Sequence, residues 1–106
     1  WRMVLVMIGY KLFRKRKDGT YGPLFIDATL RVVRDKWYRY KKVRTKGYAF
    51  RPGWHVLPEP VAPHLSTKGR VWCRVEFDPM DTIQRPSSQG GLWYLGSRMR
   101  VLEELA

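Results

Sequence analysis

The sequence predicts a small α+β domain that is mostly β, with one antiparallel, hairpin-rich sheet and one or two short helical turns. The chain has 106 residues, which is the length of a single domain. Its β-prone segments are short and separated by turn signals, and no stretch of about ten residues keeps the apolar period of an amphipathic helix. The connections also leave little room for the crossovers that parallel strands need.

The first half of the chain reads as short strands around one tight turn. Residues 1–8 are expected to be a first strand or a dispensable N-terminal extension, because they lack the cleavage site of a signal peptide. Asp18-Gly19 is typical of a hairpin turn, since glycine accepts a positive φ. Pro23 cannot donate to a ladder and places the returning strand at an edge. We expect these elements at 10–16 (strand), 17–20 (turn), 21–26 (strand), 30–34 (short β run) and 37–40 (aromatic run).

The second half contains the clearest strand of the chain, at residues 70–77. Its apolar face is formed by Val71, Cys73, Val75 and Phe77, which alternate with more polar positions. Three prolines within 58–63 argue against the interior of a helix or a strand. The remaining elements are expected as a short strand ending at Leu57, a helical turn at 62–66, a loop at 78–91 and strands at 92–95 and 99–102.

The excess of positive charge is confined to one half of the chain. The net charge is +12, with 21 Lys and Arg against nine Asp and Glu. Residues 1–51 hold 15 of these bases and three of the acids, whereas residues 52–106 hold six of each. Such a field attracts polyanions: nucleic acid, an anionic membrane surface or an acidic protein. We treat 1–106 as one domain with a basic half at 9–51 and a neutral half at 52–106.

Composition excludes several classes of protein. Hydrophobic residues make up 44% of the chain and aromatic residues 14%, which is too apolar for a disordered chain. A single cysteine allows neither an internal disulfide nor a four-cysteine zinc site. No apolar run approaches the roughly 20 residues that span a bilayer, so we expect no membrane span.

The basic and aromatic segment 34–51 is the best candidate site. Proteins that bind unpaired nucleic acid combine Lys and Arg, which neutralise phosphates, with rings that stack on bases. The alternative is a solvated basic face whose aromatic side chains belong to the core. The basic turn at 14–17 would extend the same surface. The predicted nucleic-acid-binding residues are Arg14, Lys15, Arg16, Lys17, Arg34, Lys36, Trp37, Tyr38, Arg39, Tyr40, Lys41, Lys42, Arg44 and Lys46.

A second candidate is a ligand pocket around the Pro52-Gly53 turn, where tryptophan would stack on a nucleotide and arginine would bind its phosphate. Its predicted residues are Arg51, Trp54, His55, His64, Gln89 and Trp93. A histidine at a turn more often has a structural role. No paired acid or nucleophile completes a catalytic set, and no phosphate-binding or metalloprotease motif is present. We therefore predict no catalytic residues, no cofactor and no metal, because two histidines and Cys73 lack the spacing of a zinc site.

Five stretches of the sequence resemble a group of small uncharacterised proteins of bacteriophages and mobile elements. They are GYKLFRKRKDGTYGPLFI at 9–26, KGYAFRPGWH at 46–55, APHLS at 62–66, GRVWCRVEF at 69–77 and RPSSQGGLWYL at 85–95. The resemblance covers most of residues 9–102 and implies a phage or prophage context, hence the cytoplasm of a bacterial host. It implies no mechanism.

A weaker, pattern-level similarity is to compact ADP-ribosyltransferase-like folds. Arg14, Gly53-Trp54-His55, residues 62–66 and Val71 to Val75 would take the places of that pattern. The chain is shorter than such folds, and neither Glu76 nor Glu103 is placed convincingly as a catalytic glutamate. Similarity of fold does not establish function.

Three functions follow from these observations. The preferred one is a non-catalytic, basic nucleic-acid-binding module of a phage or mobile element. The second is an anti-defence inhibitor that binds an acidic surface of a host protein complex. The third is a small nucleotide-binding or ADP-ribosyltransferase-like protein with a pocket near Arg51, Trp54 and His55.

Overall fold

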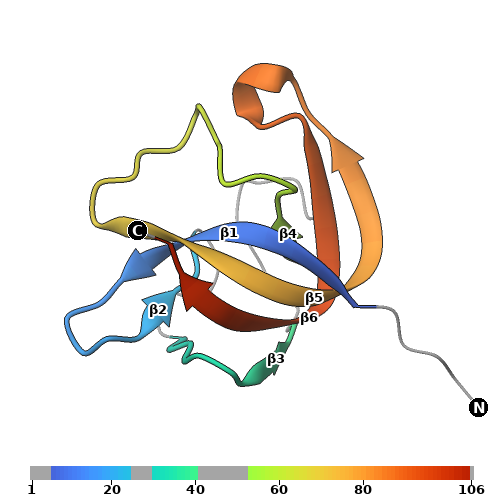
Figure 1. Cartoon of the computed structure of the whole chain (residues 1–106). Coiled ribbons are helices and arrows are strands. Elements are labelled where there is room, and N and C mark those ends of the chain that lie inside the picture. Colours follow the sequence, from blue (N-terminus) through green and yellow to red (C-terminus); the bar gives the residue numbers. More distant parts are fainter. Residues whose placement is uncertain (1–5, 25–29, 41–52, 106) are drawn as a thin grey trace, which may run out of the picture.

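A computed structural model describes residues 6–24, 30–40 and 53–105, and within them the strands form one six-stranded sheet (Figure 1). The strands lie in the order β2-β1-β5-β6-β3, β4 also pairs with β6, and all these pairings are antiparallel. This confirms the mostly β, antiparallel class. The elements are β1 (Met7–Lys15), β2 (Tyr21–Gly22), β3 (Trp37–Arg39), β4 (Trp54–Val56), β5 (Arg70–Gln84), the 3-10 helix η1 (Ser87–Gln89) and β6 (Leu92–Glu104).

The predicted Asp-Gly hairpin joins β1 to β2. Gly19 has a φ of 87°, and the amide of Gly19 donates to the carbonyl of Arg16 at 3.1 Å. The returning strand is shorter than expected, because β2 ends at Gly22, immediately before Pro23. Proline has no amide proton with which to continue the ladder.

Strands β5 and β6 form a long curved hairpin that rises to η1 (Figure 1). Two expectations were wrong here. Residues 78–84, expected in a loop, continue β5, and the two strands expected at 92–95 and 99–102 are one strand. Register shifts on both sides of Pro79 let the ladder pass a residue that cannot donate to it.

Helical structure in the described part of the chain is limited to η1. The helical turn expected at 62–66 is a single hydrogen-bonded turn, in which the amide of Leu65 donates to the carbonyl of Ala62 at 3.0 Å. The surrounding prolines remove the amide donors that a longer helix would need.

The sheet closes on itself through β4. One edge of β4 pairs with β6, and Leu57, the next residue after β4, exchanges two backbone hydrogen bonds of 2.8 Å with Tyr10 of β1. Because β1 pairs with β5 and β5 pairs with β6, the hydrogen-bonded neighbours form a ring. Closure satisfies backbone groups that an open sheet would leave at its edges.

The main core lies inside this ring. The predicted face of β5 is confirmed, since Cys73, Val75 and Phe77 are buried there beside Phe13 and Met99. A satellite cluster of Leu57, Ala62 and Trp93 is packed by Leu65, Trp72 and Ile83. The proline-rich loop therefore covers the outside of the ring with its own small core. No helix in the described residues has both the length and the apolar character needed to cross a membrane.

Candidate nucleic-acid interface

The basic turn between β1 and β2 presents some of its cations to solvent and uses others internally. Arg14, Lys15 and Lys17 are exposed. Arg16 folds back, and its guanidinium donates to the carbonyls of Tyr21 at 3.1 Å and Leu30 at 2.7 Å. Arg16 thus fastens the turn to the segment that follows β2.

The turn and the segment 30–34 form one continuous surface. Val32 and Tyr21 exchange two backbone hydrogen bonds of 2.9 Å. The Asp18 carboxylate accepts hydrogen bonds from both donors of Thr20 and pairs with Arg31 at 2.7 Å. The Thr20 hydrogen bonds lower the pKa of Asp18, and the Arg31 charge adds to the effect. The two basic segments predicted from the sequence are therefore adjacent in space.

A polar cluster joins the end of β1 to the end of β6. Lys15 forms an ion pair with Glu104, whose carboxylate also accepts a hydrogen bond of 3.1 Å from the Tyr21 hydroxyl. The hydrogen bond that Lys15 donates to Glu104 lowers the pKa of Glu104 and raises the pKa of Lys15. The Tyr21 hydroxyl, bonded to Arg34, raises the pKa of that guanidinium. The charge of Lys15 is thereby compensated. Arg34 forms no ion pair among the described residues, although the Glu104 charge also contributes to raising its pKa.

The three aromatic residues predicted to stack on bases divide between the two faces of β3. Tyr38 and Tyr40 pack against the main core, and the Tyr38 hydroxyl accepts a hydrogen bond of 2.8 Å from the amide of Val33. Trp37 alternates with Tyr38 along the strand and lies on the outer face. Trp37 and Arg39 share that face.

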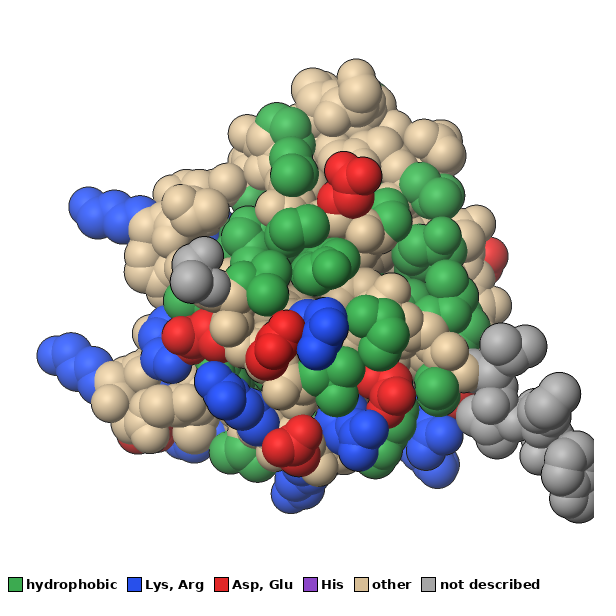
Figure 2. All heavy atoms as spheres, viewed as in Figure 1, with side chains coloured by type: hydrophobic (Ala, Val, Ile, Leu, Met, Phe, Trp, Pro, Cys, Tyr) green, Lys and Arg blue, Asp and Glu red, His purple; other side chains and the backbone are tan. Residues whose placement is uncertain are grey.

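The outer face of β5 and β6 carries a ladder of ion pairs. Arg100 pairs with Glu76 at 2.6 Å, and Arg98 pairs with Asp78 at 3.4 Å. Arg74 approaches Glu103 at 3.2 Å. Figure 2 shows the consequence, with acidic and basic side chains alternating over the lower part of the viewed face. The neutral half of the chain therefore balances much of its own charge.

Five exposed cations of the basic half have no ion pair among the described residues. Four of the five carboxylates of the two long strands pair with Lys15 of β1 or with arginines of β5 and β6, and Asp18 pairs with Arg31. Asp81 of β5 has no ion pair among the described residues. These cations therefore lie at the end of β1, on the turn that follows it and on residues 34–39, where the exposed Asp35 offsets part of their charge. The five cations are Arg14, Lys17, Arg34, Lys36 and Arg39.

Four of the predicted nucleic-acid-binding residues and one predicted pocket residue lie outside the described residues. They are Lys41, Lys42, Arg44, Lys46 and Arg51.

Three of the predicted pocket residues, His55, His64 and Gln89, contact a fourth, Trp93. The rings of His55 and His64 each lie edge-on to its indole, with centroids 6.1 Å away. The Trp93 indole nitrogen donates to the carbonyl of Gln89 at 2.8 Å. Trp54 is not part of this group, because alternation along β4 turns it into the main core, where its nitrogen donates to the carbonyl of Tyr38 at 3.0 Å.

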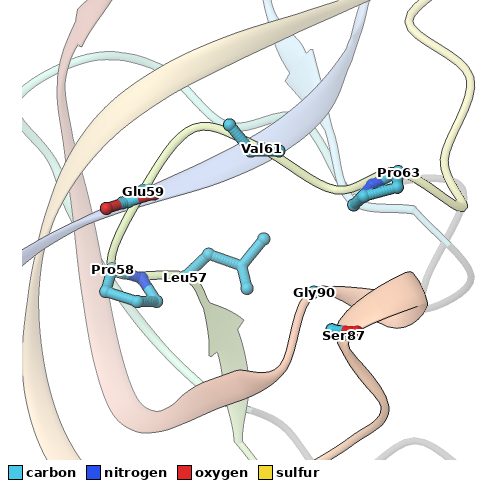
Figure 3. Close-up of a pocket in the computed structure, with 7 residues that line it drawn as sticks. All are labelled: Leu57, Pro58, Glu59, Val61, Pro63, Ser87 and Gly90. Atoms are coloured by element: carbon cyan, nitrogen blue, oxygen red, sulfur yellow. The ribbon is translucent and has the colours of Figure 1, made fainter.

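Beside Trp93 lies a cavity of about 140 Å³ that was not predicted from the sequence. Figure 3 shows residues of the proline-rich loop on one side of it and Ser87 with Gly90 on the other. Known ligand pockets have volumes of about 300–1,000 Å³, so this cavity suits a group of only a few heavy atoms. The lining residues are Leu57, Pro58, Glu59, Val61, Pro63, Ser87 and Gly90.

The described residues contain no candidate metal site, because no three of their His, Cys, Asp or Glu side chains group together.

Cys73 is fully buried. Burial raises the pKa of its thiol to about 12, and the nearby Glu104 charge adds to that effect. The thiol is therefore protonated at neutral pH and a poor nucleophile.

Comparison of the chain with protein-family models, with curated proteins and with solved structures found no match. The function is therefore argued from the residues and their geometry.

Proposed function

We propose that this protein is a non-catalytic nucleic-acid-binding module of a phage or mobile element. Its interface consists of the end of β1 and the turn that follows it, residues 14–20, together with residues 31–39. The observation that carries the proposal is the placement of charge: five exposed cations without ion-pair partners among the described residues lie on these two adjacent segments. Four of the five acids of β5 and β6 are paired with cations of β1, β5 and β6.

A phosphate backbone fits this surface because it offers regularly spaced negative charges. Cations that already have carboxylate partners gain little from a phosphate, whereas unpaired ones release condensed counterions when they bind. Asp18 and Arg16 fix the turn against residues 30–32, so the two segments present their charges together. The phage context rests on the sequence resemblance.

The direct test is fluorescence anisotropy with a labelled oligonucleotide over a series of salt concentrations. Each phosphate contact contributes about 0.9 to the slope of log affinity against log salt for duplex DNA, and about 0.7 for a single strand. We expect a steep loss of affinity between low and moderate salt. A salt-independent curve, or no binding at low salt, would refute the proposal.

Single alanine variants locate the interface. We expect Lys17→Ala and Arg39→Ala each to reduce the salt slope by about one phosphate contact and to weaken binding to all sequences alike. Arg85→Ala is the matched control, because Arg85 is also exposed but lies beyond β5 at the far end of the long hairpin. Equal effects of all three substitutions would indicate diffuse attraction and no defined interface.

A further inference from the structure

The indole of Trp37 lies against two arginine side chains on the outer face of the sheet. Trp37 is opposite Arg100 in the register of β3 and β6, and Arg98 is two residues away on the same face of β6. The guanidinium carbons of Arg98 and Arg100 lie 4.4 and 5.1 Å from the ring centroid. Both distances are within the range of cation–π contact.

Carboxylates on β5 hold both arginines in place. Glu76 lies opposite Arg100 in the register of β5 and β6 and binds its guanidinium at 2.6 Å, while Asp78 binds Arg98 at 3.4 Å. The Nε atom of Arg100 is shielded from solvent and has no hydrogen-bond partner among the described residues. The guanidinium is therefore committed to the ring and to Glu76, so the indole rests on a fixed support.

Among the described residues, no strand lies beside Trp37 on the side of β3 that faces away from β6. β3 is the last strand in the sheet order, and in the described part of the chain it pairs with β6 alone. The cation–π contacts of the Trp37 ring with described residues are those with Arg98 and Arg100 of β6. Arg39, which is exposed and has no ion pair among the described residues, shares the face of Trp37, whereas the ammonium of Lys36 lies 5.5 Å from the Tyr38 ring on the other face.

We infer that Trp37 is a stacking platform for an unpaired base, so that the ligand is single-stranded nucleic acid. This inference rests on the proposed function and deepens it. A fixed indole beside the exposed cation Arg39, which shares its face, offers a base a flat apolar surface and a phosphate one contact. In a duplex the base faces already stack on one another, and a ring on the outer face of a sheet cannot reach them. Tyr38 and Tyr40 do not share this role, because they pack against the core.

The test compares oligothymidylate of about 12 nucleotides, the corresponding oligouridylate and a duplex of the same length, within the site sizes that small domains occupy. We expect the wild type to favour both single strands over the duplex. Trp37→Leu should weaken single-strand binding by about fivefold or more and leave the weaker duplex binding unchanged. Trp37→Phe, which keeps a ring, should lose less than Trp37→Leu does.

Two readouts separate failure of this inference from failure of the proposed function. If the wild type binds none of the three oligonucleotides, the proposed function fails. If it binds duplex as tightly as single strands, or if Trp37→Leu weakens both alike, binding stands and the stacking inference is overturned.

Fluorescence keeps the test valid if Trp37→Leu does not fold. Single-stranded ligand should quench tryptophan emission of the wild type, and Trp37→Phe should lose most of that quenching while keeping the circular dichroism spectrum of the wild type. Quenching that persists in folded Trp37→Phe would assign the stacking to another of the five tryptophans and overturn the inference.

Discussion

Lys11 places an amine among the aromatic side chains of the core. It lies two residues before Phe13 on β1, and its ammonium is 5.8 Å from the Phe13 ring and 5.7 Å from the Trp54 ring. The ammonium donates one hydrogen bond of 2.8 Å to the carbonyl of His55. Loss of hydration outweighs these contacts, and burial lowers the pKa of Lys11 to about 8.

This lowered pKa predicts how stability changes with pH. Below pH 8, Lys11 is protonated in both the folded and the unfolded protein, and its burial cost is present in full. Between about pH 8 and 10.5 the unfolded chain binds more protons than the folded one, so the free energy of unfolding rises with pH. The lysine contributes a rise on the order of 3 kcal/mol, by the conversion of pKa shift to free energy.

Urea denaturation from pH 7 to 11 checks this rise by comparing the wild type with Lys11→Met. Methionine keeps the unbranched stem without the charge, so we expect the variant to be the more stable protein at pH 7. That advantage should shrink as the pH rises above about 8 and be lost by about pH 10.5. A stability difference independent of pH would show that the amine of Lys11 titrates alike in the folded and unfolded chain.

At the scale of elements, Gly9 sets how closely β1 and β4 approach where the sheet closes. A Cβ atom at Gly9 would lie 2.4 Å from Cγ1 of Val56 and 3.0 Å from both the Leu57 carbonyl and the Phe77 ring. We expect Gly9→Ala to lower the free energy of unfolding by about 1–3 kcal/mol through overpacking. Urea denaturation measures the loss.

A double-mutant cycle tests whether the contact with Val56 causes the loss of stability in Gly9→Ala. Val56→Ala removes the nearest obstructing atom, so Gly9→Ala should cost less in that background than in the wild type. Additive effects would mean that the contact with Val56 is not the source of the strain.

The strands could be predicted from the sequence where a short-range pattern of residues determines their ends. Alternation over 70–77 correctly gave the buried face of β5, and Asp18-Gly19 correctly gave the first turn. Residues 78–91 were expected to form a loop, yet the ladder continues past Pro79 through register shifts. Such bulges depend on the partner strand, because only pairing with β6 shows that a residue has been skipped.

The residue types of the candidate interface could be predicted from the sequence, but their arrangement in space could be predicted only in part. The excess charge and the aromatic content of residues 34–40 were evident in the sequence. The adjacency of the turn to that segment depends on the bridge between Tyr21 and Val32, a long-range contact without a local signal. The orientation of Trp54 could have been predicted, because the period-2 alternation of a strand places its side chain on the same face as Val56 and on the face opposite to His55.

At the scale of the whole molecule, the reaction rate of the Cys73 thiol measures how often the closed sheet opens. Its register partners are Lys11 on β1 and Glu104 on β6, so strands flank it on both sides. The thiol is fully buried, and its pKa is raised to about 12. A thiol reagent therefore has neither access to the sulfur nor a thiolate to attack while the ring of strands is intact.

Reaction of Cys73 with a disulfide reagent at pH 8 should consequently be slow in the native protein and immediate in denaturant. Because the reagent reacts only with the opened state, the labelling rate should follow the population of that state. Gly9→Ala weakens the closure between β1 and β4, and it should accelerate labelling about tenfold for each 1.4 kcal/mol of lost stability. Absorbance of the released thiolate measures the rate. Prompt reaction of one equivalent in the native protein, or equal rates in the wild type and Gly9→Ala, would show that Cys73 becomes accessible without opening of the ring, through local motion at the ends of β5 and β6.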